Sequence, residues 1–146
     1  MTVVAEILKS KTDGSVHSIA PTATVLQALQ TMADRRIGAL LVMEGQAIVG
    51  ILTERDYARK IALMGRTSLT TLVSEVMTTA VMYVQPTQTS EECMALMTQN
   101  RLRHLPVVDN GMVIGMISIG DLVKDIISEQ QFIIEQMKHY ISGGSR

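Results

Sequence analysis

The spacing of hydrophobic positions changes several times along the chain and divides it into short predicted elements. Two apolar stretches that end in proline, "HSIAP" at 17–21 and "MYVQP" at 82–86, are typical of brief strands. Thr24 and Thr89 follow as residues suited to cap a helix, and apolar residues then recur at helical spacing. Each proline therefore separates a predicted strand from a predicted helix.

The next apolar stretches come in pairs joined by turn residues, which predicts two hairpins. "IGALLVM" at 37–43 leads through "EGQ" into "AIVGIL" at 47–52, and "LPVVD" at 105–109 leads through "DNG" into "MVIGMIS" at 112–118. A helix is predicted after each hairpin. The order strand, helix, hairpin, helix thus occurs twice, and helices mixed with short sheets indicate an α/β (α+β) class.

The two halves are copies of one sequence at an offset of 65 residues, without a gap from about residue 16 to residue 62. Upstream, "VAEILK" (4–9) resembles "VSEVMT" (73–78) at an offset of 69, so the first copy has four additional residues within 10–15. The copies share the motif G-x-x-[TS]-x-x-D, which pairs Gly50 with Gly115, Thr53 with Ser118, and Asp56 with Asp121. We expect one motif with an N-terminal helix over 1–67, a second over 68–128, and a helical extension with a flexible end over 129–146.

Composition narrows the possible environments and partners of the chain. Of its 146 residues, 47% are hydrophobic and 3% aromatic, so aliphatic residues and eleven methionines must fill the interior. Thirteen basic and 14 acidic residues give a net charge of −1, which argues against a broad nucleic-acid surface. The sequence has no signal-peptide pattern and no apolar stretch of about 18 residues, so we expect a cytoplasmic protein without a membrane partner.

Cysteine and histidine, the residues most often involved in nucleophilic and metal chemistry, are few. Cys93 is the only cysteine, which excludes an intrachain disulfide and fits a reducing compartment. Its core-type helix position favours a buried apolar role over a nucleophile acting with His104. His17, His104 and His139 lack the spacing of zinc ligands. We predict no catalytic residues and no metal site.

The motif G-x-x-[TS]-x-x-D has two interpretations at the junction of a strand and a helix. In one, Thr53 or Ser118 is an N-cap, and Asp56 or Asp121 completes a capping box. In the other, the helix N-terminus and the hydroxyl bind a phosphate, and the carboxylate accepts two ribose hydroxyls. The glycine would then let a ligand approach the backbone closely. Repetition of the motif in register favours ligand binding, and the capping interpretation stays open.

The whole order of elements resembles a known family. The P-x-x-T strand ends, the strands "IGALLV" and "RHLPVV", the repeated motif and "SEVMT" make residues 2–128 similar to a tandem pair of cystathionine-β-synthase (CBS) domains. The resemblance implies two βαββα units packed by their sheets. It also implies two clefts that bind adenosine nucleotides, each joining the [TS]-x-x-D of one repeat to adenine-contacting residues of the other.

Positions matched to the family define two expected nucleotide sites. The first comprises Thr53, Arg55, Asp56, Thr79, Val81, Arg103, His104, Leu105 and Pro106. The second comprises Ser118, Asp121, Lys11, His17 and the rest of the 11–17 linker, with Ile37, Gly38 and Ala39. Arg55 stands where the second motif has Gly120, so we expect the first site to favour charged phosphate chains. The second site is expected to take a different or larger ligand, such as a dinucleotide. Solvated helix and strand ends are the alternative for Arg55 and Arg103.

The C-terminal sequence "GDLVKDIISEQQFIIEQMKHYISGG" (120–144) predicts a helix of about 20 residues. Apolar residues lie near helical spacing along it, at Leu122, Ile126, Ile133, Met137 and Tyr140, with further apolar residues beside them. This is more apolar surface than a terminal helix needs to cover one small motif. We expect the helix to pack against a second copy in a homodimer rather than fold back on its own core.

These observations predict a stand-alone regulatory module for signal transduction. It would bind AMP, ADP, ATP or NAD, require no cofactor, and act through conformation or assembly on a protein target that the sequence does not name. Two rivals are a nucleotide-processing enzyme and a nucleic-acid-binding protein that uses "RLRHL" (101–105) and "DRR" (34–36). No paired carboxylates, nucleophile–base set or metal cluster supports the first, and the net charge opposes the second.

Overall fold

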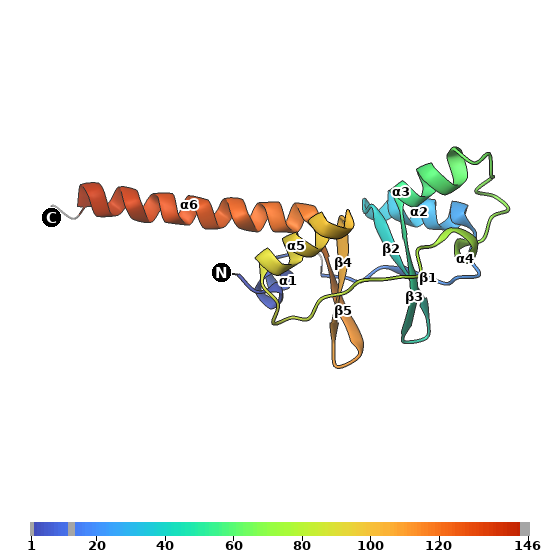
Figure 1. Cartoon of the computed structure of the whole chain (residues 1–146), viewed down its shortest axis with the longest axis horizontal. Helices are drawn as coiled ribbons and strands as arrows, with labels where there is room; N and C mark the ends of the chain where they lie inside the picture. Colours follow the sequence, from blue (N-terminus) through green and yellow to red (C-terminus); the bar gives the residue numbers. More distant parts are fainter. Residues whose placement is uncertain (1, 12–13, 144–146) are drawn as a thin grey trace. The chain divides into compact units, whose positions relative to one another are not determined.

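A computed structural model describes residues 2–11 and 14–143 of the chain. The order of helices and strands confirms the predicted mixed α/β class, with one three-stranded and one two-stranded sheet among these residues (Figure 1). The chain divides into two compact units. The β1–β3 unit comprises residues 15–83 and 110–114, and the β4–β5 unit comprises the described residues of 1–14, 84–109 and 115–146.

The β1–β3 unit is built on the first hairpin. Strand β1 (Ser18–Ile19) runs parallel to β2 (Ala39–Glu44), which pairs antiparallel with β3 (Ala47–Thr53). Its helices are α2 (Val25–Arg35), α3 (Glu54–Tyr57), the π-helical segment η1 (Ala58–Ala62) and α4 (Val73–Val76). Thr24 caps α2 through a capping box with Gln27, as its position predicted.

The β4–β5 unit repeats this plan with a longer final helix. It contains α1 (Val4–Ser10), α5 (Ser90–Asn100), β4 (His104–Asp109), β5 (Met112–Ser118) and α6 (Ile119–Gly143), although residues 112–114 of β5 group with the other unit. Thr89 caps α5 through a box with Glu92. Cys93 and Met97 of α5 are buried in the core of this unit, which confirms the predicted apolar role of Cys93.

The predicted strand at 82–86 is reduced to a single parallel bridge between Val84 and Val107. Proline explains the difference between the copies. In the first copy, Leu41 N–H donates to the His17 carbonyl at 3.3 Å and extends the ladder of β1 and β2. The matching donor in the second copy would be Pro106, which has no N–H. Only the bonds made by Val84, at 2.9 Å on each side, remain.

The leading helices exchange places, because each packs on the copy that it does not precede in the chain. The expected division at residue 67 stays a prediction. Val4 and Ile7 of α1, which precede the first repeat, lie in the core of the β4–β5 unit. Val73 and Val76 of α4, which precede the second repeat, lie in the core of the β1–β3 unit. The same backbone bond anchors both helices: Val4 N–H donates to Gln88 O and Val73 N–H to Ala23 O, each at 2.8 Å.

The motif glycines make room for these leading helices. A Cβ added at Gly50 would lie 2.6 Å from Met77 Sδ, and one added at Gly115 would lie 2.6 Å from Leu8 Cδ2. Met77 and Leu8 are matched residues at the offset of 69. Close packing of the leading helices therefore accounts for both glycines, and the expected role in ligand approach is not needed to explain them.

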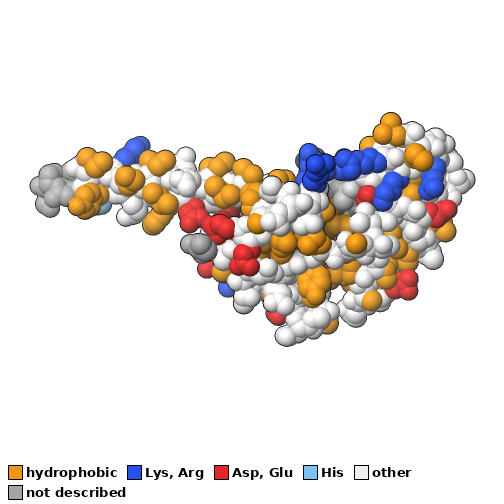
Figure 2. Space-filling model, viewed as in Figure 1, with side chains coloured by type: hydrophobic (Ala, Val, Ile, Leu, Met, Phe, Trp, Pro, Cys, Tyr) orange, Lys and Arg blue, Asp and Glu red, His pale blue; other side chains and the backbone are white. Residues whose placement is uncertain are grey.

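Helix α6 confirms the predicted C-terminal helix over residues 119–143. Leu122 is fully buried in the core of its unit, whereas the apolar side chains from Ile126 to Ile141 are at least 38% exposed. Figure 1 shows α6 continuing past α5 and α1 of the same unit, and Figure 2 shows hydrophobic side chains exposed along it. Within this single chain, the helix does not fold back on its own core. Residues 144–146 of the expected flexible end lie outside the described residues.

Candidate functional site

Each motif forms a capping box where a strand of the hairpin meets a helix. Thr53 ends β3, its N–H donates to Asp56 Oδ2 at 3.0 Å, and Asp56 N–H donates to Thr53 Oγ1 at 3.1 Å. In the second copy, Ser118 N–H donates to Asp121 Oδ2 at 2.9 Å and Asp121 N–H to Ser118 Oγ at 3.1 Å. The capping interpretation is therefore correct for both copies, and any ligand must bind to residues that already have this structural role.

At the start of each helix, a further N–H donates to a backbone carbonyl that lies just before the hairpin. Glu54 N–H donates to Gly38 O at 3.1 Å, and Ile119 N–H donates to Arg103 O at 2.8 Å. Two of the first three helical N–H groups are thus bonded within the protein. The helix N-terminus is correspondingly less available to a phosphate, and the side chains of each box must contribute more of any binding.

Asp56 carries two contacts that the sequence analysis missed. Its Oδ1 accepts a hydrogen bond from Thr78 Oγ1 at 3.2 Å and lies 3.3 Å from Lys60 Nζ. Lys60 also donates to Val76 O at 2.9 Å, which fixes the ammonium between α4 and the box. The spacing of Lys60, four residues after Asp56, was the signal that could have revealed the pair.

Asp121 obtains its positive partner from a different part of the chain. At the position that matches Lys60 the second copy has Asp125, so the same pair cannot form. Instead Lys11, in the segment with four additional residues, lies 3.0 Å from Asp121 Oδ2 and donates to Met116 O at 2.8 Å. The structure thus brings together Lys11, Ser118 and Asp121, three residues expected in the second site.

His104 lies in the electrostatic environment of the same box. Burial is the main influence and lowers the pKa of its imidazole below the ordinary value of 6.5. Asp121 opposes this by raising the pKa, while Lys11 and Arg103 lower it further. The imidazole is therefore neutral around pH 7 and can donate or accept a hydrogen bond without adding positive charge.

The residues expected in the first site are divided between the units. Thr53, Arg55, Asp56, Thr79 and Val81 belong to the β1–β3 unit, and residues 103–106 belong to the β4–β5 unit. The side chain of Leu105 is fully buried in the core, which leaves only its backbone for a ligand. That these two groups form one site stays a prediction.

The residues expected in the second site are divided in the same way. Lys11, Ser118 and Asp121 belong to the β4–β5 unit, whereas His17, Ile37, Gly38 and Ala39 belong to the β1–β3 unit. Inside that unit, Ala39 pairs with Thr53. Residues 12 and 13 of the expected linker lie outside the described residues. Joining the two groups in one site likewise stays a prediction.

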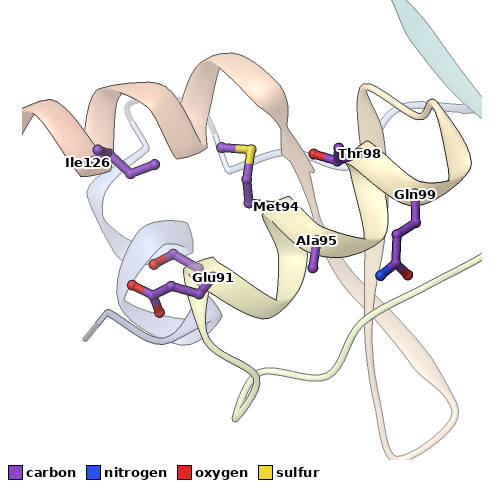
Figure 3. A pocket seen from close by; sticks show the side chains of 7 residues that line it. Glu91, Met94, Ala95, Thr98, Gln99 and Ile126 are labelled. Carbon is purple, nitrogen blue, oxygen red and sulfur yellow. The ribbon is translucent and has the colours of Figure 1, made fainter.

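A groove that the sequence analysis missed lies between α5 and α6, away from the capping boxes. It has a volume of about 360 Å³, and Met94 of α5 and Ile126 of α6 line it from the two helices (Figure 3). Ser90, also in its lining, has a buried Oγ without a hydrogen-bond partner among the residues that the structure describes. Among the described residues, no three His, Cys, Asp or Glu side chains converge as a metal site requires.

The repeated box, the exchanged leading helices and the two hairpins together define the class of protein. The chain belongs to the CBS-domain family, whose model matches residues 4–63 and 73–128. It is 40% identical to the mitochondrial CBS domain-containing protein CBSX3 of Arabidopsis thaliana, over 98% of this chain and 73% of the relative. It is 34% identical to the CBS domain-containing protein YhcV of Bacillus subtilis (strain 168), over 79% of this chain and 81% of the relative.

Solved structures agree with this assignment. A CBS-domain protein of Burkholderia ambifaria MC40-6, named for a role in signal transduction, superposes with a TM-score of 0.86 at 53% identity, covering 88% of this chain and 96% of that chain. A hexameric CBS-CP12 protein from bloom-forming cyanobacteria gives a TM-score of 0.75 at 30% identity, covering 84% and 70%. The chain is therefore a CBS pair of a regulatory and signal-transduction family.

The comparisons leave the location of the protein open. No helix in the described part of the chain is both long and apolar enough to cross a bilayer. Because one relative is mitochondrial, the cytoplasmic location expected from the sequence stays a prediction.

Proposed function

We propose that this protein is a non-catalytic regulatory module that binds the adenosine nucleotides AMP, ADP, ATP or NAD beside its two capping boxes. One observation carries the proposal: each box holds an aspartate paired with a lysine, next to a hydroxyl at a strand end. The distances are 3.3 Å from Lys60 to Asp56 and 3.0 Å from Lys11 to Asp121. A carboxylate suits two ribose hydroxyls and an ammonium suits a phosphate, so groups for both parts of a nucleotide are adjacent.

The contacts of Asp56 would allow a ligand to bind without dismantling the cap. Capping uses Oδ2, whereas Thr78 and Lys60 both contact Oδ1. Ribose hydroxyls could replace the contacts of Oδ1 while Thr53 keeps its bond to Oδ2. Lys60, whose side chain is 41% exposed, could then turn toward a phosphate. At the second box, Lys11 and the Ser118 N–H share the same oxygen of Asp121, so a ligand would meet a different arrangement.

Thermal denaturation with a series of nucleotides tests the ligand class. AMP, ADP, ATP or NAD should raise the melting temperature, and guanosine nucleotides should raise it less. At a hundredfold excess over the dissociation constant, one site should contribute roughly 2.7 kcal/mol to the free energy of unfolding. The double variant Asp56→Asn/Asp121→Asn is the matched control and should lose the response. Absence of a response to every adenine compound would contradict the proposal.

Titration calorimetry of the single variants separates binding from capping. Asp56→Asn keeps part of the cap, so the free energy of unfolding should fall by no more than about 1 kcal/mol. If Asp56 holds a ribose, affinity at one site should fall by roughly 1.5–3 kcal/mol, the scale of a hydrogen bond to a charged group. Asp121→Asn should weaken the other site. Unchanged affinity in both variants would leave the aspartates with a capping role only.

Substitution of Arg103 tests whether a site is composite, that is, formed by residues of both repeats. We propose, from the family pattern, that Arg103 acts with Thr53 and Asp56, although its carbonyl bonds to Ile119 beside the other box. Arg103→Ala should then lower the affinity of the same site as Asp56→Asn. The affinity for ATP should fall more than the affinity for adenosine. If Arg103→Ala instead lowers the affinity of the site that Asp121→Asn disrupts, the assignment of Arg103 to a composite site with Asp56 is wrong.

We also propose that the protein forms a homodimer through the exposed apolar surface of α6. Side chains such as Ile127, Met137 and Tyr140 are more than half exposed, and large exposed apolar patches usually mark interfaces. The hexameric CBS-CP12 protein supports the idea that chains of this fold assemble. Assembly would give a module without catalytic residues a way to transmit ligand binding.

A further inference from the structure

The exposed apolar residues of α6 form a stripe with a regular seven-residue repeat. Three adjacent lines run along the helix: a central line of Val123, Gln130 and Met137, a second of Ile119, Ile126, Ile133 and Tyr140, and a third of Ile127, Ile134 and Ile141. All of these apolar side chains are between 38% and 82% exposed. Phe132 is also exposed but lies on the opposite face of the helix, and Glu135 lies there too.

A seven-residue repeat has a specific structural meaning. On a straight helix with 3.6 residues per turn, such lines drift around the axis, whereas two helices that supercoil at 3.5 residues per turn keep them in contact. We infer that α6 pairs with α6 of a second copy, parallel and in register, so that each central line faces its own counterpart. This inference rests on the self-association part of the proposed function and specifies its partner and geometry.

Gln130 supports pairing in register. It is the only polar residue on the three lines and stands in the middle of the central one. In a parallel, in-register pair, its amide meets the same amide of the other copy and can form a hydrogen bond with it. An antiparallel pair centred on Gln130 would bring the same two amides together, so Gln130 specifies the register of the pair and not its direction. A single polar residue at such a position is known to specify register and oligomeric state.

Charges at the two edges of the stripe favour the parallel direction. Lys124, Gln131 and Lys138 follow one edge, and Glu129 and Gln136 follow the other. A parallel two-fold pair places the edge with lysines opposite the edge with Glu129. An antiparallel pair would place the lysines of both copies at the same edge of the interface. Like charges at that edge would repel, and opposite charges attract.

The size of the stripe is sufficient for a stable pair. Full burial of one large apolar side chain removes roughly 60–120 Å² from water. The nine apolar side chains of the three lines are about half exposed, so pairing would bury roughly 300–500 Å² of apolar surface per copy. A standard interface buries about 800 Å² per partner, a little over half of it apolar.

Neighbouring residues on opposite faces of α6 provide a matched test of the stripe. Ile133→Asp places a charge in the proposed interface and should raise the dissociation constant of the dimer at least about tenfold in sedimentation equilibrium. Phe132→Asp places the same charge on the opposite face and should leave the constant unchanged. Circular dichroism checks that both variants keep their helix. Equal effects of the two variants, or a wild-type chain that is monomeric, would overturn the inference.

Disulfide cross-linking tests the direction and register. Met137→Cys should form an oxidised dimer readily, because residue 137 meets its counterpart in a parallel pair, whereas Glu135→Cys on the opposite face should not. Cys93 does not interfere, because it is fully buried, and burial raises the pKa of its thiol to about 11. A sedimenting dimer that Met137→Cys does not cross-link would refute the parallel register. Nucleotide affinity is measured separately, so that a failure of the pairing inference can be distinguished from a failure of the proposed ligand binding.

Discussion

At the scale of single residues, the motif combines packing, capping and charge pairing in seven positions. Gly50 leaves room for Met77, Thr53 and Asp56 cap α3, and Asp56 holds Lys60. The packing and the cap serve the fold, so the repetition of the motif does not by itself demonstrate ligand binding. Each carboxylate also holds a partly exposed lysine, with side chains 41% exposed at Lys60 and 24% exposed at Lys11, and this is the group that a phosphate could recruit.

The packing role of Gly50 can be measured directly. Gly50→Ala places a Cβ 2.6 Å from Met77 Sδ and 3.0 Å from Thr78 O, so the free energy of unfolding should fall by about 1–3 kcal/mol. Gly14→Ala is the control and should change it little, because apart from its chain neighbours no described atom would lie within 4 Å of the added Cβ. The double variant Gly50→Ala/Met77→Ala should recover part of the loss in urea denaturation. No loss in Gly50→Ala would refute the packing explanation.

His104 should make stability depend on pH. Because burial lowers its folded-state pKa below 6.5, the unfolded chain binds a proton first as the pH falls. The stability that the neutral imidazole contributes is therefore complete above about pH 6.5 and is lost as the pH falls through the unfolded pKa toward the folded one. His104→Ala should flatten this part of the melting-temperature profile. Identical profiles for wild type and His104→Ala would contradict this account.

At the scale of elements, the two copies show how one sequence pattern gives different structures. A missing N–H at Pro106 reduces a strand to a bridge. After the capping box, the first copy has α3 and the π-helical η1, whereas α6 of the second copy continues for 25 residues. Both leading helices pack on the copy that they do not precede in the chain.

The exchange of leading helices predicts where a core substitution in α1 acts. Ile7→Ala should lower the free energy of unfolding by about 2–5 kcal/mol, because Ile7 is only 3% exposed. Hydrogen exchange should quicken in α5 and β4, whose residues share its core cluster, more than in α2 and β2. Glu6→Ala, on the exposed side of α1, is the control. Faster exchange mainly in α2 and β2 would show that α1 stabilises the first repeat instead.

At the scale of the whole molecule, α6 connects the second capping box to the surface proposed for assembly. Asp121 lies in the first turn of this helix, and the apolar stripe continues to Ile141. A ligand that changes the contacts of Asp121 would therefore act on the helix that pairs the copies. By thermodynamic linkage, a ligand that favours the dimer must bind more tightly to the dimer.

Truncation of α6 separates the two proposed properties of the molecule, self-association and nucleotide binding. Removing residues 129–146 should abolish or strongly weaken the dimer in sedimentation velocity, since most of the stripe is lost. Nucleotide binding should persist in calorimetry, because Lys11, Ser118 and Asp121 and the whole β1–β3 unit remain. A dimer of unchanged affinity after truncation would move the interface to the helices of the repeats.

The sequence by itself determined the elements, the copies and their caps. Hairpins, N-caps at Thr24 and Thr89, and the buried position of Cys93 follow from patterns within a few residues, because turn chemistry, capping and helical spacing are local properties. The family resemblance also indicated the aspartates and Lys11 as site residues.

Only the tertiary structure decided which distant residues meet. Lys11 bonds to the carbonyl of Met116, 105 residues away, and Thr78 bonds to Asp56, 22 residues away. The exchange of α1 and α4 and the fit of Met77 against Gly50 also bring together residues that are distant in the sequence. No local pattern encodes such pairs, because hydrophobic and polar spacing states that a face will be buried but not which surface will cover it.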